Sequence, residues 1–296
     1  MIPLQELLTE CCFSNPFVMI GSLLGVGLCI GTLAGLFGVG GGFLTVPILE
    51  SLFGFNFTIS VGSNLASSIG TSSVGLARHG KLGNVEPRTM LILALGSVPG
   101  ALLGAEIHQW LFDMLGDSFR QLMRGMFVVL LVSAAWLVWR GPRQTPHGKS
   151  LMQRLPIGPH VDLPRAGIKG VSLPGMIAMS LSVGLLVGLM GVGGGVLFMP
   201  LLVMVVGMSV HQAVGTSLGV VCCSTIVAVV RYGLTGQVSL WIALSILTGS
   251  AVGVQFGSWL CDRLQARRLR RYFALLVIGA AVLLVVKMAY AVNAAE

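Results

Sequence analysis

The chain is a succession of long apolar runs separated by short polar stretches, and this pattern restricts its fold more than any other feature. Most of the runs approach the roughly 20 residues that an α-helix needs to cross a lipid bilayer. Charged residues make up only 9% of the chain, whereas soluble domains carry about 25%. Most of the surface must therefore face lipid, and the sequence predicts an all-α integral membrane protein. The apolar runs fall at about 16–37, 43–53, 58–78, 89–111, 121–139, 172–190, 196–208, 211–231, 238–260 and 272–292.

The two halves of the chain carry the same motif in the same register. Gly35–Pro47 reads GLFGVGGGFLTVP, and Gly188–Pro200 reads GLMGVGGGVLFMP. The offset of 153 residues (35 to 188) continues without a gap and also pairs Arg78 with Arg231. A register that holds over this length indicates an internal duplication.

Basic residues indicate how the two copies lie in the membrane, because loops rich in Lys and Arg stay in the cytoplasm. We predict two transmembrane repeats, 16–140 and 172–293, of about four to five helical segments each, joined by a basic cytoplasmic linker at 141–171. The loop 261–271 is also basic, but its counterpart at about 108–118 has no Lys or Arg and is predicted to be external. Equivalent loops then face opposite sides, so the repeats are predicted to be inverted, with both termini external.

Each repeat contains four glycines within five residues, at Gly38–Gly42 and at Gly191–Gly195. Glycine reaches positive φ freely, so these clusters are expected to break a membrane helix. Broken backbone is tolerated in a bilayer only where protein buries it or where it lines a cavity. A short apolar run restarts after each cluster, and its first turn offers free N–H groups and partial positive charge, which suit an anion. Inverted copies would bring the two Gly-broken hairpins together near the middle of the membrane, as in many secondary transporters.

The glycines have an alternative interpretation, because small residues also allow helices to pack closely. Two copies, each followed by a short run with Pro47 or Pro200, favour a substrate site. Hydroxyl and amide groups further along each repeat could hydrogen-bond an oxyanion, or could bind neighbouring helices instead. The candidate substrate-binding residues are Gly40, Gly41, Gly42, Phe43, Ser63, Asn64, Gly193, Gly194, Gly195, Val196, Thr216 and Ser217.

Two arginines end the helices that carry these polar groups. Arg78 and Arg231 lie fourteen residues beyond Asn64 and Ser217, so they should sit near opposite membrane faces. Each could be a snorkelling anchor or could attract anions into a vestibule. Glu106 is the only acid inside a long apolar run and lies near its external end, so no central carboxylate for ion coupling is apparent.

Other classes of function fit the chain poorly. The net charge of +8 could suggest nucleic acid, but the basic residues lie in short stretches between apolar runs, so no nucleic-acid partner is expected. The six cysteines form no CxxC pair and no Cys/His spacing for zinc, so we expect no metal or cofactor. A membrane enzyme would need clustered His, Asp, Glu or Cys at one membrane face, and the sequence shows no such cluster.

With these motifs in view, the chain resembles the sulfite exporter TauE/SafE family. The resemblance rests on the paired GxGGGxxxxP motifs at Gly38–Pro47 and Gly191–Pro200, on the VGxxL segments that follow them, and on the Arg-x-Gly pairs at Arg78 and Arg231. It implies a homodimeric transporter of the bacterial inner membrane that moves a small sulfur-containing anion such as sulfite, thiosulfate or an organosulfonate. A passive small-anion channel and a carboxylate transporter on the same scaffold remain alternatives. The expected partners of the chain are the small anionic substrate, the lipid bilayer and a second copy of the chain.

Overall fold

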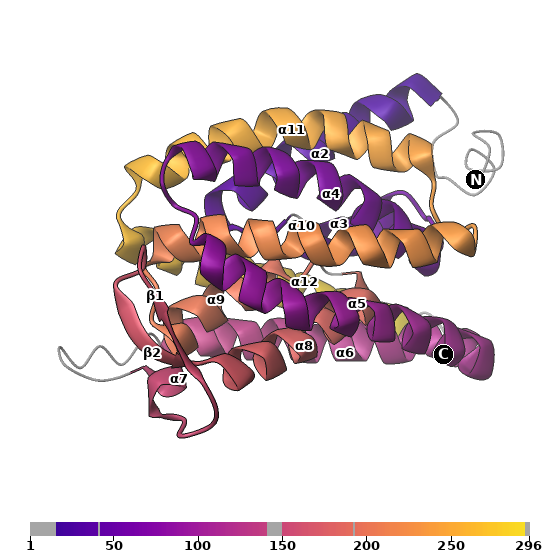
Figure 1. The fold of residues 1–296 in the computed structure, drawn as a ribbon. Coiled ribbons are helices and arrows are strands. Elements are labelled where there is room, and N and C mark those ends of the chain that lie inside the picture. The colour runs from indigo at the N-terminus through magenta and orange to yellow at the C-terminus, as the bar shows by residue number, and fades with distance from the viewer. Residues whose placement is uncertain (1–15, 41, 141–149, 192, 294–296) are drawn as a thin grey trace.

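The computed structural model describes residues 16–40, 42–140, 150–191 and 193–293, and these residues are largely helical (Figure 1). The prediction of an all-α membrane protein is therefore confirmed. The first half contains α2 (Pro16–Phe37), α3 (Gly42–Leu52), α4 (Phe57–Lys81), α5 (Pro87–Leu115) and α6 (Asp117–Arg140). The second half contains α8 (Leu173–Met190), α9 (Gly195–Leu201), the π-helical segment η1 (Leu202–Val206), α10 (Val210–Leu234), α11 (Leu240–Arg263) and α12 (Ala266–Asn293).

Within the described ranges, five helices are long and apolar enough to cross a membrane: α2, α5, α8, α10 and α11. Large apolar side chains cover their outer surfaces. Leu95 on α5 and Val252 on α11, for example, are 67% and 59% exposed. Such apolar surface suits contact with acyl chains rather than with water. The chain is a multi-pass membrane protein.

The elements of the two halves correspond at the offset of 153 residues. The helices α4 and α10 have equivalent first and last residues, and both α3 and α9 begin at the last glycine of their cluster. The starts of α4 and α10 are also capped alike. The Asn56 side chain accepts a hydrogen bond from the Thr58 N–H (3.2 Å), and the Ser209 hydroxyl accepts one from the Gln212 N–H (3.4 Å).

Two pairs of helices pack closely, and each pair consists of one helix from the first half and one from the second. Helix α2 packs along α11, and α8 packs along α5 (Figure 1). A Cβ on Gly31 would collide with the Ser250 carbonyl oxygen, and a Cβ on the equivalent Gly184 would collide with that of Ser97. Glycines spaced four residues apart lie on one helix face and let two backbones approach closely. The other glycines of these contacts are Gly27, Gly35, Gly249, Gly253 and Gly257 in the first pair and Gly96, Gly100, Gly104 and Gly188 in the second.

The equivalent helices α4 and α10 lie side by side and run in opposite directions. A Cβ on Gly62, near the start of α4, would meet the carbonyl oxygen of Gln237, just beyond the end of α10. A Cβ on Gly215, near the start of α10, would meet Asn84 and would lie 3.1 Å from the Cβ of His79, at the end of α4. Antiparallel equivalent helices are compatible with inverted repeats, which stay a prediction. The orientation across the membrane stays a prediction.

The linker contains structure that the sequence did not predict. A short helix, α7 (Leu151–Arg154), is followed by β1 (His160–Leu163) and β2 (Ile168–Ser172), which pair as an antiparallel hairpin. The hairpin lies at one end of the helical bundle, and the start of α2 and the end of α12 lie at the other (Figure 1).

Hydrogen bonds attach the hairpin to the helices at its end of the bundle. The Arg165 guanidinium donates to the Val85 carbonyl (3.3 Å), and the Gln212 amide donates to the Arg165 carbonyl (2.7 Å). On the same turn of α10 as Gln212, His211 bonds the Leu264 carbonyl (3.2 Å). The linker and the loop after α11, which the sequence predicted to be cytoplasmic, therefore gather at one end together with the loop after α4.

Candidate functional site

The two glycine clusters meet in the interior of the protein. Gly38–Gly42, here called the first glycine break, separates α2 from α3, and Gly191–Gly195, the second glycine break, separates α8 from α9. A Cβ on Gly195 would collide with the backbone of Gly38 and Val39, and a Cβ on Gly193 would lie 3.6 Å from the Cα of Gly42. The breaks therefore touch backbone to backbone, although about 150 residues of chain separate them.

Positive φ angles explain why these positions are glycine. Backbone with φ near +70° costs an ordinary L-residue roughly 1–2 kcal/mol, whereas glycine adopts it freely. Glycines with positive φ occur in both breaks, and Gly38 and Gly40 correspond to Gly191 and Gly193. The glycines with positive φ are Gly38 (φ +70°) and Gly40 (+67°) in the first break, and Gly191 (+65°), Gly193 (+71°) and Gly194 (+71°) in the second. Gly41, a predicted site residue, lies outside the described residues.

Side chains from each repeat bind the glycine break of the other repeat. The Asn64 amide on α4 donates to the carbonyl oxygens of Gly191 (2.6 Å) and Gly42 (3.4 Å). At the equivalent position on α10, the Ser217 hydroxyl donates to the Gly38 carbonyl (2.8 Å). Asn64 and Ser217 were both predicted site residues, and the structure brings both to the breaks. In this conformation their donors bind backbone oxygens.

Further side chains bind carbonyl oxygens in and beside the breaks. His79 on α4 and Tyr232 on α10 occupy equivalent positions, and each bonds the carbonyl of the equivalent glycine near the end of α2 or α8. These bonds are His79 Nε2 to Gly35 (2.9 Å), Tyr232 Oη to Gly188 (2.9 Å), Ser68 Oγ to Gly40 (3.2 Å) and His108 Nδ1 to Leu189 (2.7 Å). Sequence analysis named neither His79 nor Tyr232 as part of the site and did not single out Tyr232. Its position 153 residues after His79 is the signal that could have identified it.

These hydrogen bonds change the electrostatic environment of the two breaks. A carbonyl oxygen repels an anion, and side-chain donors bind the carbonyl oxygens of Gly38, Gly40, Gly42 and Gly191. The N–H groups of the first helical turn have no partner within their own helix, and the start of a helix carries partial positive charge. Helix α3, with 11 residues, starts at Gly42 inside the contact between the breaks. The start of α3 therefore directs partial positive charge to the contact between the two breaks.

Ser63 and Thr216 join the two repeats at a second pair of equivalent positions. The Ser63 hydroxyl accepts a hydrogen bond from the Ser239 N–H at the start of α11 (2.9 Å). The Thr216 hydroxyl accepts one from the Glu86 N–H at the start of α5 (3.0 Å). Both hydroxyls act as acceptors in these bonds, so their own hydrogens are not used there. These two predicted site residues directly precede Asn64 and Ser217 in the chain, and each bonds the N–H of the N-cap residue of a helix in the other repeat.

The described site residues are closed off from solvent. Phe43 and Val196, the second residues of α3 and α9, are 1% and 0% exposed, and the described glycines of both breaks are buried. Pro47 and Pro200 each occupy the sixth position of the short helix, beyond its first turn. The structure is therefore occluded at the point where the two breaks meet.

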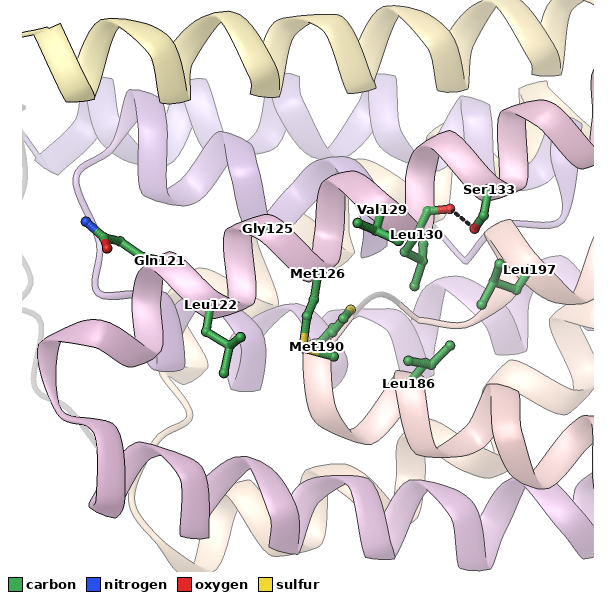
Figure 2. Close-up of a pocket in the computed structure, with 10 residues that line it drawn as sticks. All are labelled: Gln121, Leu122, Gly125, Met126, Val129, Leu130, Ser133, Leu186, Met190 and Leu197. Atoms are coloured by element: carbon green, nitrogen blue, oxygen red, sulfur yellow. Dashed lines mark hydrogen bonds between the residues drawn. The ribbon is translucent and has the colours of Figure 1, made fainter.

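An apolar cavity of about 430 Å³ lies beside the second break, between α6, α8 and α9. Figure 2 shows Met190, which directly precedes the break, and Leu197 of α9 pointing into the same space as Met126 of α6. The Ser133 hydroxyl, one of two polar side chains in the lining, donates to the Leu130 carbonyl (2.8 Å). A cavity with this lining would not stabilise a charged substrate.

The two predicted vestibule arginines have different surroundings. Arg231 on α10 forms a two-pronged ion pair with Glu106 on α5, through Nε to Oε1 and through Nη2 to Oε2 (3.0 Å). The side chains of this pair are 29% and 55% exposed, so a surface ion pair of this kind stabilises the fold little. Arg78 is exposed near the last residue of α4, at the end of the bundle where the linker hairpin lies. The antiparallel helices thus place Arg78 and Arg231 at opposite ends of the bundle, and their location at opposite membrane faces stays a prediction.

Comparison with known proteins supplies a family. The model of the family described as sulfite exporter TauE/SafE matches residues 23–284. A "Probable membrane transporter protein" of Xylella fastidiosa is 29% identical over 262 residues, which cover 88% of this chain and 92% of the relative. The "Probable membrane transporter protein YjnA" of Bacillus subtilis is 28% identical over 87% of this chain and 96% of its own length. A relative of the same general name from Methanocaldococcus jannaschii is 26% identical over 80% of this chain and 86% of its own length. No solved structure matches the chain.

Proposed function

Because the chain belongs to the sulfite exporter TauE/SafE family, we propose that it is a secondary carrier of a small sulfur-containing anion such as sulfite, thiosulfate or an organosulfonate. Membrane transport is the activity that the names of the relatives share. The observation that carries the proposal is the contact between the two glycine breaks, with their carbonyl oxygens bound by Asn64, Ser217 and Ser68.

The chemistry around the breaks suits an oxyanion. The groups available to a substrate are backbone N–H groups, hydroxyls and an amide, all of them neutral donors. Such donors can stabilise a charge strongly where water is excluded, because the local dielectric is low. They also allow release, since no salt bridge has to be broken. A small anion with several oxygen atoms could bind several of these donors at once.

The occluded geometry favours a carrier over a channel. A channel needs a continuous path, whereas the glycine breaks bury each other and their flanking residues Phe43 and Val196. In a carrier, the substrate enters when one repeat moves relative to the other. The side-chain bonds of Asn64 and Ser217 cross between the repeats. We propose that these bonds open when the substrate enters, and that their donors then turn to the anion.

The proposed location is the inner membrane of a bacterium, with the linker in the cytoplasm and both termini in the periplasm. Two arrangements support it. The basic segments gather at the hairpin end, and the start of α2 and the end of α12 lie at the opposite end (Figure 1). A homodimer is proposed from the family resemblance, and light scattering on the detergent-solubilised protein would test it.

The direct test uses the purified protein in proteoliposomes. Thermal shift would first screen sulfite, thiosulfate, sulfonates, sulfate and carboxylates for binding. Uptake of the stabilising anion should saturate with concentration, and unlabelled anion on the far side should accelerate it. Linear flux without such counter-transport would identify a channel. Preference for carboxylates over sulfur anions would keep the carrier mechanism and overturn the proposed substrate class.

A further inference from the structure

The apolar cavity beside the second glycine break extends along α6 as a groove (Figure 2). Its residues on α6 recur at helical spacing and form one stripe: Gln121, Leu122, Gly125, Met126, Val129, Leu130 and Ser133. From Gln121 to Ser133 the helix rises by about 18 Å. One leaflet of a bilayer contributes about 15 Å of hydrocarbon. The groove is therefore about as long as one leaflet is thick.

The groove opens on the side of the bundle that faces lipid. Leu122 and Val129, at its rim, are 42% and 68% exposed, whereas Leu130 and Met190, at its floor, are 5% and 1% exposed. The opposite wall belongs to α8, which is long and apolar enough to cross a membrane. Helix α5 begins beside the linker hairpin, so α6, which follows the other end of α5, starts away from the hairpin. An acyl chain of the leaflet at that end can enter the groove from the side.

Neither water nor a helix of a second copy suits this groove. A buried water needs two to four polar partners, and the Ser133 hydroxyl already donates to the Leu130 carbonyl (2.8 Å). Spread over about 18 Å, the volume of about 430 Å³ gives a mean cross-section of about 24 Å². A helix about 10 Å wide has a cross-section of about 80 Å². A polymethylene chain, whose atoms pack about 4 Å from their neighbours, is narrow enough to fit.

The outer end of the groove suits a phospholipid headgroup. Gln121 is exposed there, and its amide group can donate and accept hydrogen bonds. The sequence places Asp117, Arg120 and Arg124 in the same two turns of α6. Residues of both charge signs therefore lie at this end, which complements the phosphate and the ammonium group of phosphoethanolamine. A polar end and an apolar body together match a phospholipid.

The groove also touches both sides of the second glycine break. Met190 directly precedes Gly191, and Leu197 belongs to α9, where its N–H donates to the Gly194 carbonyl (3.0 Å). A chain in the groove would pack against Met190 and Leu197 and would support the conformation in which the two breaks touch. A shift of α8 or α9 against α6 would change the shape of the groove and expel the chain.

The first half carries larger side chains at two equivalent positions. Phe37 corresponds to Met190, and its ring centroid lies 5.4 Å from that of Phe273 on α12. Ile278 corresponds to Gly125. Aromatic side chains bury large areas and fill the space between helices. The groove therefore depends on Gly125 and Met190 themselves and not only on the helix arrangement that the two halves share.

We propose that this groove binds one acyl chain of a phospholipid from the leaflet at the end away from the hairpin, and that the bound chain stabilises the occluded conformation. The second part of the inference rests on the proposed function as a carrier. Within lipid the gain comes from van der Waals contact with the groove, because an empty groove would lose those contacts. The chain fits the groove only while the breaks touch. By this difference in affinity, the lipid favours the occluded state over the open states.

Photo-crosslinking tests the binding in the intact protein. The parent is reconstituted in vesicles of phosphatidylethanolamine and phosphatidylglycerol, with a small fraction of phosphatidylethanolamine that carries a diazirine near the end of one acyl chain. After illumination, peptide mass spectrometry identifies the labelled residues. Val252 on α11 is 59% exposed, so bulk lipid should label it. Met190 is 1% exposed and lines the groove, so its labelling requires a chain inside the groove, and we expect Met190 to be labelled.

Gly125→Trp fills the groove with a side chain that cannot leave it. A Cβ at Gly125 would meet nothing within 4 Å, so the fold should tolerate the change. Gly279→Trp on α12 is the matched control, because a Cβ there would also meet nothing within 4 Å and the residue is exposed. Labelling of Met190 should be lost in Gly125→Trp and should stay as in the parent in Gly279→Trp.

Exchange of labelled for unlabelled thiosulfate tests the effect on the occluded state. Gly125→Trp should slow exchange by about tenfold, because the indole stays in the groove and opposes the movement of α8 and α9. Gly279→Trp should exchange as the parent does. Gly125→Ile introduces the residue that the first half carries at the equivalent position and should lower both Met190 labelling and exchange. This smaller change decides the outcome if the tryptophan variant does not fold.

The other outcomes overturn the inference or separate it from the proposed function. Labelling of Val252 without labelling of Met190 in the parent overturns it, whether the groove is then empty or filled by a second copy. Met190 labelling that persists in both Gly125 variants also overturns it. Lost labelling with unchanged exchange overturns the stabilisation of the occluded state and leaves the lipid site. If Met190 is labelled but the parent exchanges none of the screened anions, the proposed function fails and the lipid site stands.

Discussion

Replacing Gly194 by valine should strongly weaken anion binding, and the structure gives the size of the effect. Gly194 has a φ of +71°, and a Cβ at this position would lie 2.5 Å from Cγ2 of Val187 and 3.2 Å from the Phe198 ring. Left-handed backbone costs an L-residue roughly 1–2 kcal/mol, and overpacking a dense interior costs typically about 1–3 kcal/mol. The second glycine break should therefore relax to another conformation in the variant.

Binding would then have to restore the strained conformation. The combined penalty of about 2–5 kcal/mol corresponds to roughly a 30- to 5,000-fold loss of affinity. Calorimetry or thermal shift with the anion, on detergent-purified protein that elutes as the parent does, measures this loss. Gly25→Val is the matched control, because Gly25 is exposed in α2 and a Cβ there would meet nothing within 4 Å. Equal anion affinity in Gly194→Val and the parent would show that the glycine is a packing residue and that the site lies elsewhere.

Three other expectations test the packing, the ion pair and the topology. Gly31→Ala should lower the free energy of unfolding by about 1–3 kcal/mol, because the new Cβ would meet the Ser250 carbonyl. The melting temperature should fall accordingly, and an unchanged melting temperature would refute the close α2–α11 contact. Glu106→Gln should keep substantial anion flux, because its ion pair with Arg231 is exposed; complete loss at normal expression would mean that Glu106 is a coupling site. In a cysteine-free background, Lys169→Cys should react with a membrane-impermeant maleimide only from the cytoplasm and Met114→Cys only from outside. Labelling of both from one side would exclude the inverted topology.

Local patterns in the sequence determined the elements of this protein. A run of about 20 apolar residues must form a helix in lipid, because the bilayer offers its backbone no other hydrogen-bond partners. The breaks after α2 and α8 were predictable for the same kind of reason, since a four-glycine cluster cannot sustain a membrane helix. The duplication then paired the segments of the two halves. Asn64 and Ser217 could be named as site residues because they occupy equivalent positions in polar helices.

The tertiary structure decided which groups meet. Asn64 binds Gly191, 127 positions away, and no periodicity within a helix encodes a contact of that range. The same holds for the packing of α2 on α11 and of α8 on α5. Each of these contacts between the halves depends on glycines on the facing surfaces of both helices. Glu86 is the clearest case, because its sequence surroundings are those of a polar loop. Its burial arises only when that loop folds against α10 and Thr216 binds its backbone. Side-chain type and spacing thus fix what a segment can form, whereas the dielectric and the hydrogen-bond partners around each group exist only once the repeats have packed together.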